Sequence, residues 1–192
     1  MNLATDLKIW QDNIEISDLY GGTSVYAKSN CNKSRYLLGR VGNKNILFIG
    51  INPNTACHNK YDLTTKKIAK FSILNNFDGW ILANIYPQRT LTPAQLPNKP
   101  EMNEIKTNVD SILKAINVYD IENICCCWGN AISERLYFFE ILAELVSFTK
   151  KKRFFRLGDL SKAGNPKHPS RLSYSTPLVS FNVKDYLYNK KL

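Results

Sequence analysis

The chain has 192 residues, of which 44% are hydrophobic, so it can bury one continuous core but is short for two domains. Lysine and arginine outnumber aspartate and glutamate by 26 to 16, and the net charge of +10 favours a polyanionic partner such as a nucleic acid. Biased base composition in the genome is the simpler explanation of the same excess. No apolar run could span a membrane and the first residues lack a signal-peptide pattern, so we expect a cytoplasmic protein.

The five cysteines suit neither a disulfide framework nor a metal site. Cys31 and Cys57 stand alone, whereas Cys125, Cys126 and Cys127 are consecutive. Successive side chains of a strand point to opposite faces, so these three fit a buried strand better than a metal cage. We therefore expect reduced thiols, no bound metal and no cofactor.

The hydrophobic pattern predicts strands and helices that alternate along the chain. Short apolar runs are typical of strands covered on both faces, and apolar residues spaced three or four apart are typical of helices. In chain order, we expect a hairpin at 24–28 and 36–41, a strand at 46–51, a helix at 63–74, a strand at 80–85, a helix at 103–116, a strand at 121–128, a helix at 131–148 and a strand at 153–157.

This alternation predicts parallel strands joined by right-handed crossovers. We expect an α/β fold, a three-layer α/β/α sandwich around a central, mostly parallel four-stranded sheet. The whole chain, 1–192, is expected to form one domain, with roughly the first 45 residues as a peripheral extension that adds the hairpin beside the sheet. Ligands of such sheets bind beyond the carboxyl ends of the strands.

A polar motif follows each of the four predicted strands. The motifs read G-I-N-P-N-T-A from Gly50, A-N-I-Y-P from Ala83, W-G-N from Trp128 and N-P-K-H-P-S-R-L-S from Asn165. Taken singly, each is an ordinary turn, because Asn-Pro and Gly are common in turns and a loop histidine is more often a surface residue. Their order at successive strand ends is the more specific observation.

In this order, the segments G-I-N-P, A-N-I-Y-P, C-W-G-N-A and H-P-S-R-L-S resemble motifs of the uracil-DNA glycosylase superfamily. The last is similar to the H-P-S-P-L-S of its classical members, with Arg171 in place of proline, and the first to the G-I-N-P of its mismatch-specific branch. R-Y-L-L at Arg35, N-P-N-T-A at Asn52, D-L-T at Asp62 and G-N-P-K-H-P at Gly164 carry a closer resemblance, to a bacterial and phage family of unknown function.

The superfamily resemblance implies a monofunctional DNA glycosylase that hydrolyses the N-glycosidic bond of uracil or another altered base. His168 and Asn52 are the implied catalytic residues: His168 would donate a hydrogen bond to the departing base, and Asn52 would position the attacking water. Asn84 would read the base, because a carboxamide offers both a donor and an acceptor. Asn52 cannot take a proton as a carboxylate does, so Asp62 is an additional candidate, although it fits a helix N-cap equally well.

A bound base also stacks on an aromatic ring, and the candidates are Tyr61, Phe71 and Tyr86. Phe71 fits the buried face of a helix just as well.

The predicted partner is DNA with a flipped base, bound by a monomer. Leu172 is the candidate that fills the gap left in the stack. Arg171, Ser170, Lys167 and Arg89 are the candidates for contacts with the DNA, and ordinary solvated charge is the alternative for the basic residues.

Two other functions fit the same residues. A DNA- or modified-base-binding module that has lost hydrolysis is favoured by the missing carboxylate at position 52. A hydrolase of free nucleosides or nucleotides would use the same pocket but would not need Leu172 or the basic rim.

Overall fold

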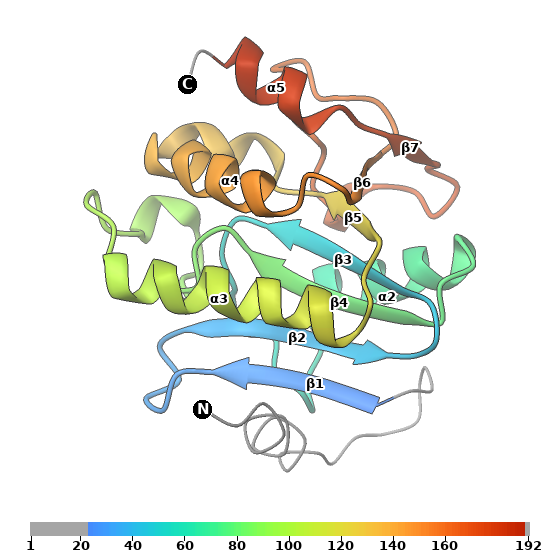
Figure 1. Ribbon diagram of the computed structural model, residues 1–192, viewed down its shortest axis with the longest axis horizontal. Coiled ribbons are helices and arrows are strands. Elements are labelled where there is room, and N and C mark those ends of the chain that lie inside the picture. Colours follow the sequence, from blue (N-terminus) through green and yellow to red (C-terminus); the bar gives the residue numbers. More distant parts are fainter. Residues whose placement is uncertain (1–22, 191–192) are drawn as a thin grey trace.

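The computed structural model describes residues 23–190, in which seven strands form one mixed sheet in the order β1-β2-β4-β3-β5-β6-β7 (Figure 1). The strands are β1 (Thr23–Lys28), β2 (Arg35–Val41), β3 (Asn45–Gly50), β4 (Gly79–Asn84), β5 (Asn123–Cys126), β6 (Arg153–Leu157) and β7 (Leu178–Ser180). The predicted α/β class is therefore confirmed, and the predicted strands 46–51, 80–85, 121–128 and 153–157 correspond to β3, β4, β5 and β6.

The expectation of a mostly parallel, four-stranded sheet is wrong, because antiparallel strands extend the sheet on both sides and make it a mixed one. The pairings β3–β4, β3–β5 and β5–β6 are parallel, whereas β1–β2, β2–β4 and β6–β7 are antiparallel. The hairpin of β1 and β2 is present, but β2 pairs with β4 inside the sheet and is buried except at its last residue. β7 has only three residues, too few for a hydrophobic pattern to reveal.

Helices cover both faces of the sheet, with α2 on one side and α3, α4 and α5 on the other (Figure 1). They are α2 (Leu63–Leu74), α3 (Met102–Val118), α4 (Tyr137–Phe148) and α5 (Val183–Asn189), and η1 (Pro93–Gln95), η2 (Gly129–Glu134) and η3 (Pro169–Arg171) are short 3-10 helices. The helix predicted at 131–148 starts only at Tyr137, because the extended backbone of Arg135 separates it from η2.

The central strands alternate between two cores. In β3, Ile46 and Phe48 face α2, and Leu47 and Ile49 face α3 and α4. Each of these side chains is at most 2% exposed, and burying one of this size contributes about 1.5–3 kcal/mol. A strand buried on both faces reads as a continuous apolar run, which is why these strands were predictable.

The cysteines of β5 follow the same alternation. Cys125 and Cys127 pack in the core beside α2, and Cys126 packs in the other, as predicted. All three are free thiols, and burial raises their pKa values. They therefore behave as small hydrophobic side chains.

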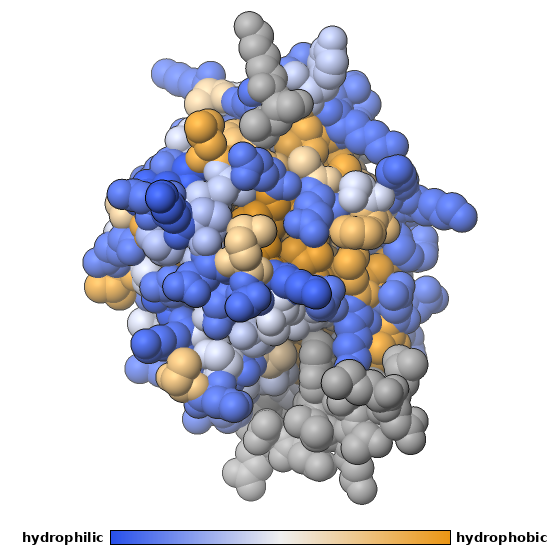
Figure 2. Space-filling view, turned by 60° about the vertical axis from the view of Figure 1, so that its left-hand side comes forward, coloured by the Kyte–Doolittle hydropathy of each residue, from blue (hydrophilic) through white to orange (hydrophobic). Residues whose placement is uncertain are grey.

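Figure 2 brings forward the side of the molecule toward which β3 and β4 run in Figure 1. Hydrophobic residues form an area near the middle of this view, among hydrophilic ones. Leu91, Met102 and Leu136 are large hydrophobic side chains that are more than half exposed. Among the described residues, no helix is long and apolar enough to cross a membrane.

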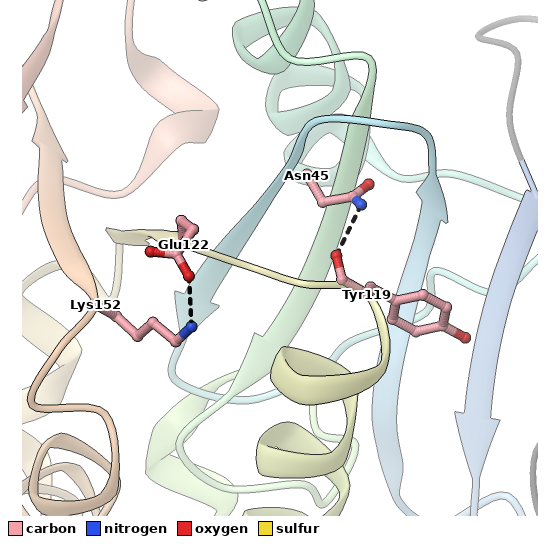
Figure 3. Close-up of polar contacts among 4 residues, drawn as sticks. All are labelled: Asn45, Tyr119, Glu122 and Lys152. Carbon is pink, nitrogen blue, oxygen red and sulfur yellow. Dashed lines mark hydrogen bonds and ion pairs between the residues drawn. The ribbon is translucent and has the colours of Figure 1, made fainter.

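Polar contacts brace the amino ends of the parallel strands (Figure 3). The side chain of Asn45, at the start of β3, donates a hydrogen bond to the carbonyl oxygen of Tyr119 over 3.1 Å. Lys152, just before β6, donates to Glu122, just before β5, over 2.8 Å. The hydrogen bond from Lys152 lowers the pKa of Glu122. These contacts lie at the end of the sheet opposite to the carboxyl ends of the parallel strands.

Candidate functional site

A cavity of about 320 Å³ lies at the carboxyl ends of β3, β4 and β5. Asn52, Asn84, Asp62 and His168 line it, so the structure brings together four of the predicted site residues from distant parts of the sequence. Parallel strands place their carboxyl ends along one edge, which is the physical reason for this convergence.

Asn84, the last residue of β4, lies in the wall of the cavity and is 3% exposed. Its amide nitrogen has no hydrogen-bond partner among the described residues. Gly50 makes room for it, because a Cβ at position 50 would lie 2.8 Å from Oδ1 of Asn84. An unpaired buried amide costs about 1–3 kcal/mol, so a ligand that satisfies the Asn84 carboxamide gains that free energy.

The side chain of Asn52 is held by Thr90, and both residues line the cavity. Its Nδ2 donates to the carbonyl oxygen of Thr90 over 3.1 Å and to Oγ1 over 2.8 Å. The Thr90 hydroxyl donates in turn to the carbonyl oxygen of Thr92, so Oγ1 acts as an acceptor toward Asn52. This fixes the amide plane and leaves Oδ1 of Asn52 to accept a hydrogen bond from a ligand or water.

His168 precedes η3, and its ring is oriented by Ser170. Nδ1 lies 2.9 Å from the Ser170 hydroxyl and accepts from the Ser170 backbone N–H over 3.4 Å. A nitrogen that accepts from a backbone amide is unprotonated, so the neutral ring carries its proton on Nε2. Solvent reaches part of the side chain, but crowding by protein atoms lowers the pKa of His168, Arg171 adds to this and Asp62 opposes it.

Asp62 is both a helix cap and a cavity residue. Its Oδ1 accepts from the backbone N–H of Thr65 over 2.8 Å and from the Thr65 hydroxyl over 2.9 Å, which confirms the predicted N-cap of α2. The same carboxylate lines the cavity. The cap holds it in place and leaves Oδ2 without a donor among the described residues.

The three predicted aromatic residues do not line the cavity. Tyr61 packs its ring against Trp80 with a centroid distance of 5.6 Å, and Phe71 and Tyr86 are each 1% exposed in the two cores. Trp128, two residues after β5, is in the lining, but its ring is also 1% exposed and packs against Phe181 and Tyr186. Its position in the motif W-G-N at a strand end was the signal for it in the sequence.

The loop that carries His168 is packed closely on the turn after β5. Gly129 adopts φ +67°, and a Cβ there would lie 3.2 Å from Cβ of His168. Oδ1 of Asn130 accepts from the Ser161 hydroxyl over 2.6 Å and from Nδ2 of the buried Asn165 over 3.1 Å. Segments that are far apart in the sequence therefore set the position of the imidazole.

The candidates for DNA contact lie around the same loop. Leu172 is half-buried against the core beside α2, and its carbonyl oxygen accepts from Nζ of Lys67 over 2.6 Å. Arg171 is exposed and Lys167 is half-buried, whereas the Ser170 hydroxyl is used by His168.

Arg89 is tied to the protein rather than free at the rim. Its Nη1 donates to the carbonyl oxygens of Asn54 over 2.5 Å and Ala56 over 3.0 Å, and Nη2 donates to the Tyr26 hydroxyl over 2.9 Å. The guanidinium group thus holds the loop after β3 in shape.

Arg35 is a cavity residue that was not predicted from the sequence. It opens β2 and is 2% exposed, and its Nη1 donates to the carbonyl oxygen of Ala56 over 3.0 Å. An arginine directly before an apolar strand, as in R-Y-L-L, was the available signal. Among the described residues, no group of three or more His, Cys, Asp or Glu side chains could hold a metal ion.

The fold and the site define an α/β protein with a polar cavity at the carboxyl ends of its parallel strands. Residues 35–170 match the family described as "Protein of unknown function (DUF1643)". The match covers more than half of the chain, so the chain belongs to this family, in agreement with the resemblance to a family of unknown function. No curated protein matches the chain.

Proposed function

We propose that this protein is a monofunctional DNA glycosylase with the fold of the uracil-DNA glycosylase superfamily, which hydrolyses the bond between deoxyribose and uracil or another altered base. The observation that carries the proposal is the buried carboxamide of Asn84 in the cavity wall, whose amide nitrogen is unpaired. Buried polar groups are normally hydrogen-bonded in proteins, and this unpaired amide lies in the wall of a cavity, where a ligand can supply the missing acceptor. The ring N–H and adjacent carbonyl of a pyrimidine match a carboxamide.

His168 is the proposed electrophilic residue. Cleavage of the glycosidic bond builds negative charge on the departing base, and a donor aimed at a base carbonyl lowers the barrier. The contacts with Ser170 leave the proton on Nε2, and the lowered pKa keeps the ring neutral at physiological pH. A neutral Nε2–H is such a donor.

Asn52 and Asp62 are the proposed residues for the attacking water. Because Thr90 holds the amide nitrogen of Asn52, Oδ1 is available to accept a hydrogen bond from that water. Asp62 supplies the carboxylate that can take its proton, which an amide cannot do. The order of the motifs along the chain, from G-I-N-P to H-P-S-R-L-S, supports the same assignment.

A base-release assay tests the proposal. The protein is incubated with single- and double-stranded oligonucleotides carrying uracil, other deaminated bases or hypermodified pyrimidines, and alkali then cleaves the abasic sites. We expect strand scission with one substrate and a rate lowered about 100- to 1,000-fold by His168→Ala. His58→Ala is the matched control, because the chain has two histidines and the ring of His58 packs, tilted, against Tyr26 instead of lining the cavity.

A DNA-binding module without hydrolysis is the second candidate, and the amide at position 52 favours it. No scission with any substrate, together with retained binding of one modified oligonucleotide, would establish that alternative. Scission that survives both His168→Ala and Asn84→Ala would show that the activity comes from elsewhere.

A further inference from the structure

Arg35 is a buried charge whose hydrogen-bonding capacity is largely unused. Its side chain lines the cavity at 2% exposure, and in the described part of the chain its five side-chain N–H groups make one hydrogen bond, to the carbonyl oxygen of Ala56. Its Nε is buried without a partner. A buried guanidinium is normally satisfied by several acceptors, so its spare donors favour a group brought by a ligand.

A second guanidinium lies beside it. Nη1 of Arg89 donates to the same Ala56 carbonyl oxygen, over the same 3.0 Å as Nη1 of Arg35. Burial, and then the neighbouring charge of Arg89, lower the pKa of Arg35 to about 10, because two cations that share one acceptor repel each other. An anion bound here would offset both the burial of the Arg35 charge and its repulsion by Arg89.

The described residues provide no ion pair for either arginine. Among residues 23–190, no carboxylate oxygen lies within 4.0 Å of either guanidinium, and Asp62, whose charge acts on Arg35, uses Oδ1 to cap α2. Asp62 raises the pKa of Arg35 from a greater distance, but less than burial and Arg89 lower it. Within the described part of the chain, the positive charge of Arg35 is therefore not neutralised by an ion pair.

We propose that Arg35 anchors an oxyanion subsite of the cavity, which binds a carboxylate or phosphate group carried by the ligand. The inference builds on the proposed function, because it takes the cavity as a nucleobase pocket and narrows the ligand to an acidic one. Guanidinium groups bind carboxylates and phosphates through paired N–H donors, and Arg35 keeps such donors free. The oxyanion comes either from an acidic substituent on the base or from the phosphate of a nucleotide.

Binding measurements on the full-length protein distinguish the two sources. Isothermal titration compares 5-carboxyuracil with 5-carbamoyluracil, its neutral isostere, and uridine 5′-monophosphate with uridine. We expect one charged compound to bind about 10- to 100-fold tighter than its neutral counterpart. The first pair assigns the oxyanion to the base, and the second assigns it to the nucleotide phosphate.

The same binding measurements on variants of Arg35 test whether this residue causes the preference for the charged compound. Arg35→Met keeps an unbranched apolar stem without the guanidinium group, so it removes the preference for the charged compound, whereas Arg35→Lys keeps part of that preference. Arg153→Met, at the exposed amino end of β6, is the matched control and leaves the preference unchanged. The comparison of charged and neutral compounds on the wild-type protein needs no variant, so it tests the oxyanion subsite even if Arg35→Met fails to fold.

Equal affinities within both pairs would overturn the oxyanion subsite while leaving the nucleobase pocket intact. If no pyrimidine compound binds, the pocket itself is wrong and this inference falls with it. Conversely, a charge preference without base release in any oligonucleotide assay would support the subsite and count against hydrolysis only.

Discussion

Asn84 and Asn108 are buried asparagines that differ in what their amide nitrogens do. Nδ2 of Asn108 donates to the carbonyl oxygens of Asn84 over 2.8 Å and Ile85 over 3.2 Å, whereas Nδ2 of Asn84 is unpaired. We predict that Asn108→Ala lowers the free energy of unfolding by about 1–3 kcal/mol, and that Asn84→Ala leaves it unchanged or raises it. Urea unfolding measures both. A loss in Asn84→Ala as large as that in Asn108→Ala would contradict a ligand-binding role for Asn84.

Ionisation of His168 makes the stability of the protein depend on pH. Its folded-state pKa is lowered, so the unfolded chain takes up the proton first as the pH falls. We therefore expect stability to decrease below pH 6.5, the ordinary pKa of histidine, and His168→Gln to lose less stability over that range. Thermal unfolding from pH 7 to pH 5 measures this, with His58→Gln as control. Identical pH profiles for His168→Gln and the wild type would contradict the assignment.

The sequence predicted polar site residues better than aromatic ones. Asn52, Asn84 and His168 meet because strand ends meet, and a strand end is visible in a hydrophobic pattern. Tyr61 and Phe71 had suitable chemistry, but a ring on α2 or beside Trp80 serves the core equally well. Arg35 was missed because burial of a charge depends on tertiary contacts, which residue type alone does not reveal.

Among the elements, the loop around η3 depends on α2. Nζ of Lys67 donates to the carbonyl oxygen of Leu172 and lies 4.0 Å from the centroid of the Tyr174 ring. We predict that Lys67→Met increases amide hydrogen exchange in residues 169–176 about 3- to 10-fold. Lys66→Met, one position along the same helix and exposed, is the control. Unchanged hydrogen exchange in Lys67→Met would show that the loop around η3 does not depend on its contacts with Lys67.

The hydrophobic pattern predicted some helices and strands better than others. β3 and β4 were found because each is a continuous apolar run, and helix α2 because its apolar residues recur at helical spacing. The boundary between η2 and α4 was not, because nothing in G-N-A-I-S-E distinguishes a 3-10 turn from the first turn of a helix. β7 forms only because β6 offers it a free edge.

For the whole molecule, the net charge of +10 predicts salt-dependent DNA binding. We expect affinity for an unmodified oligonucleotide to fall linearly on logarithmic axes as salt rises. Lys167→Ala and Arg171→Ala each reduce that slope by about one, whereas Lys150→Ala, at the amino edge of the sheet, does not. Fluorescence anisotropy across a salt series measures the slopes. Binding that is insensitive to salt would contradict a phosphate-contacting surface.

The central claim is that the cavity receives a nucleobase on Asn84, and the NMR signals of the asparagine side-chain amides test it most directly. The isotope-labelled protein is titrated with the oligonucleotide that it binds or cleaves. We predict that the Asn84 amide protons shift downfield as they gain an acceptor, while those of Asn108, already bonded to two carbonyl oxygens, stay in place. Saturated DNA binding without any change at Asn84 would contradict the claim.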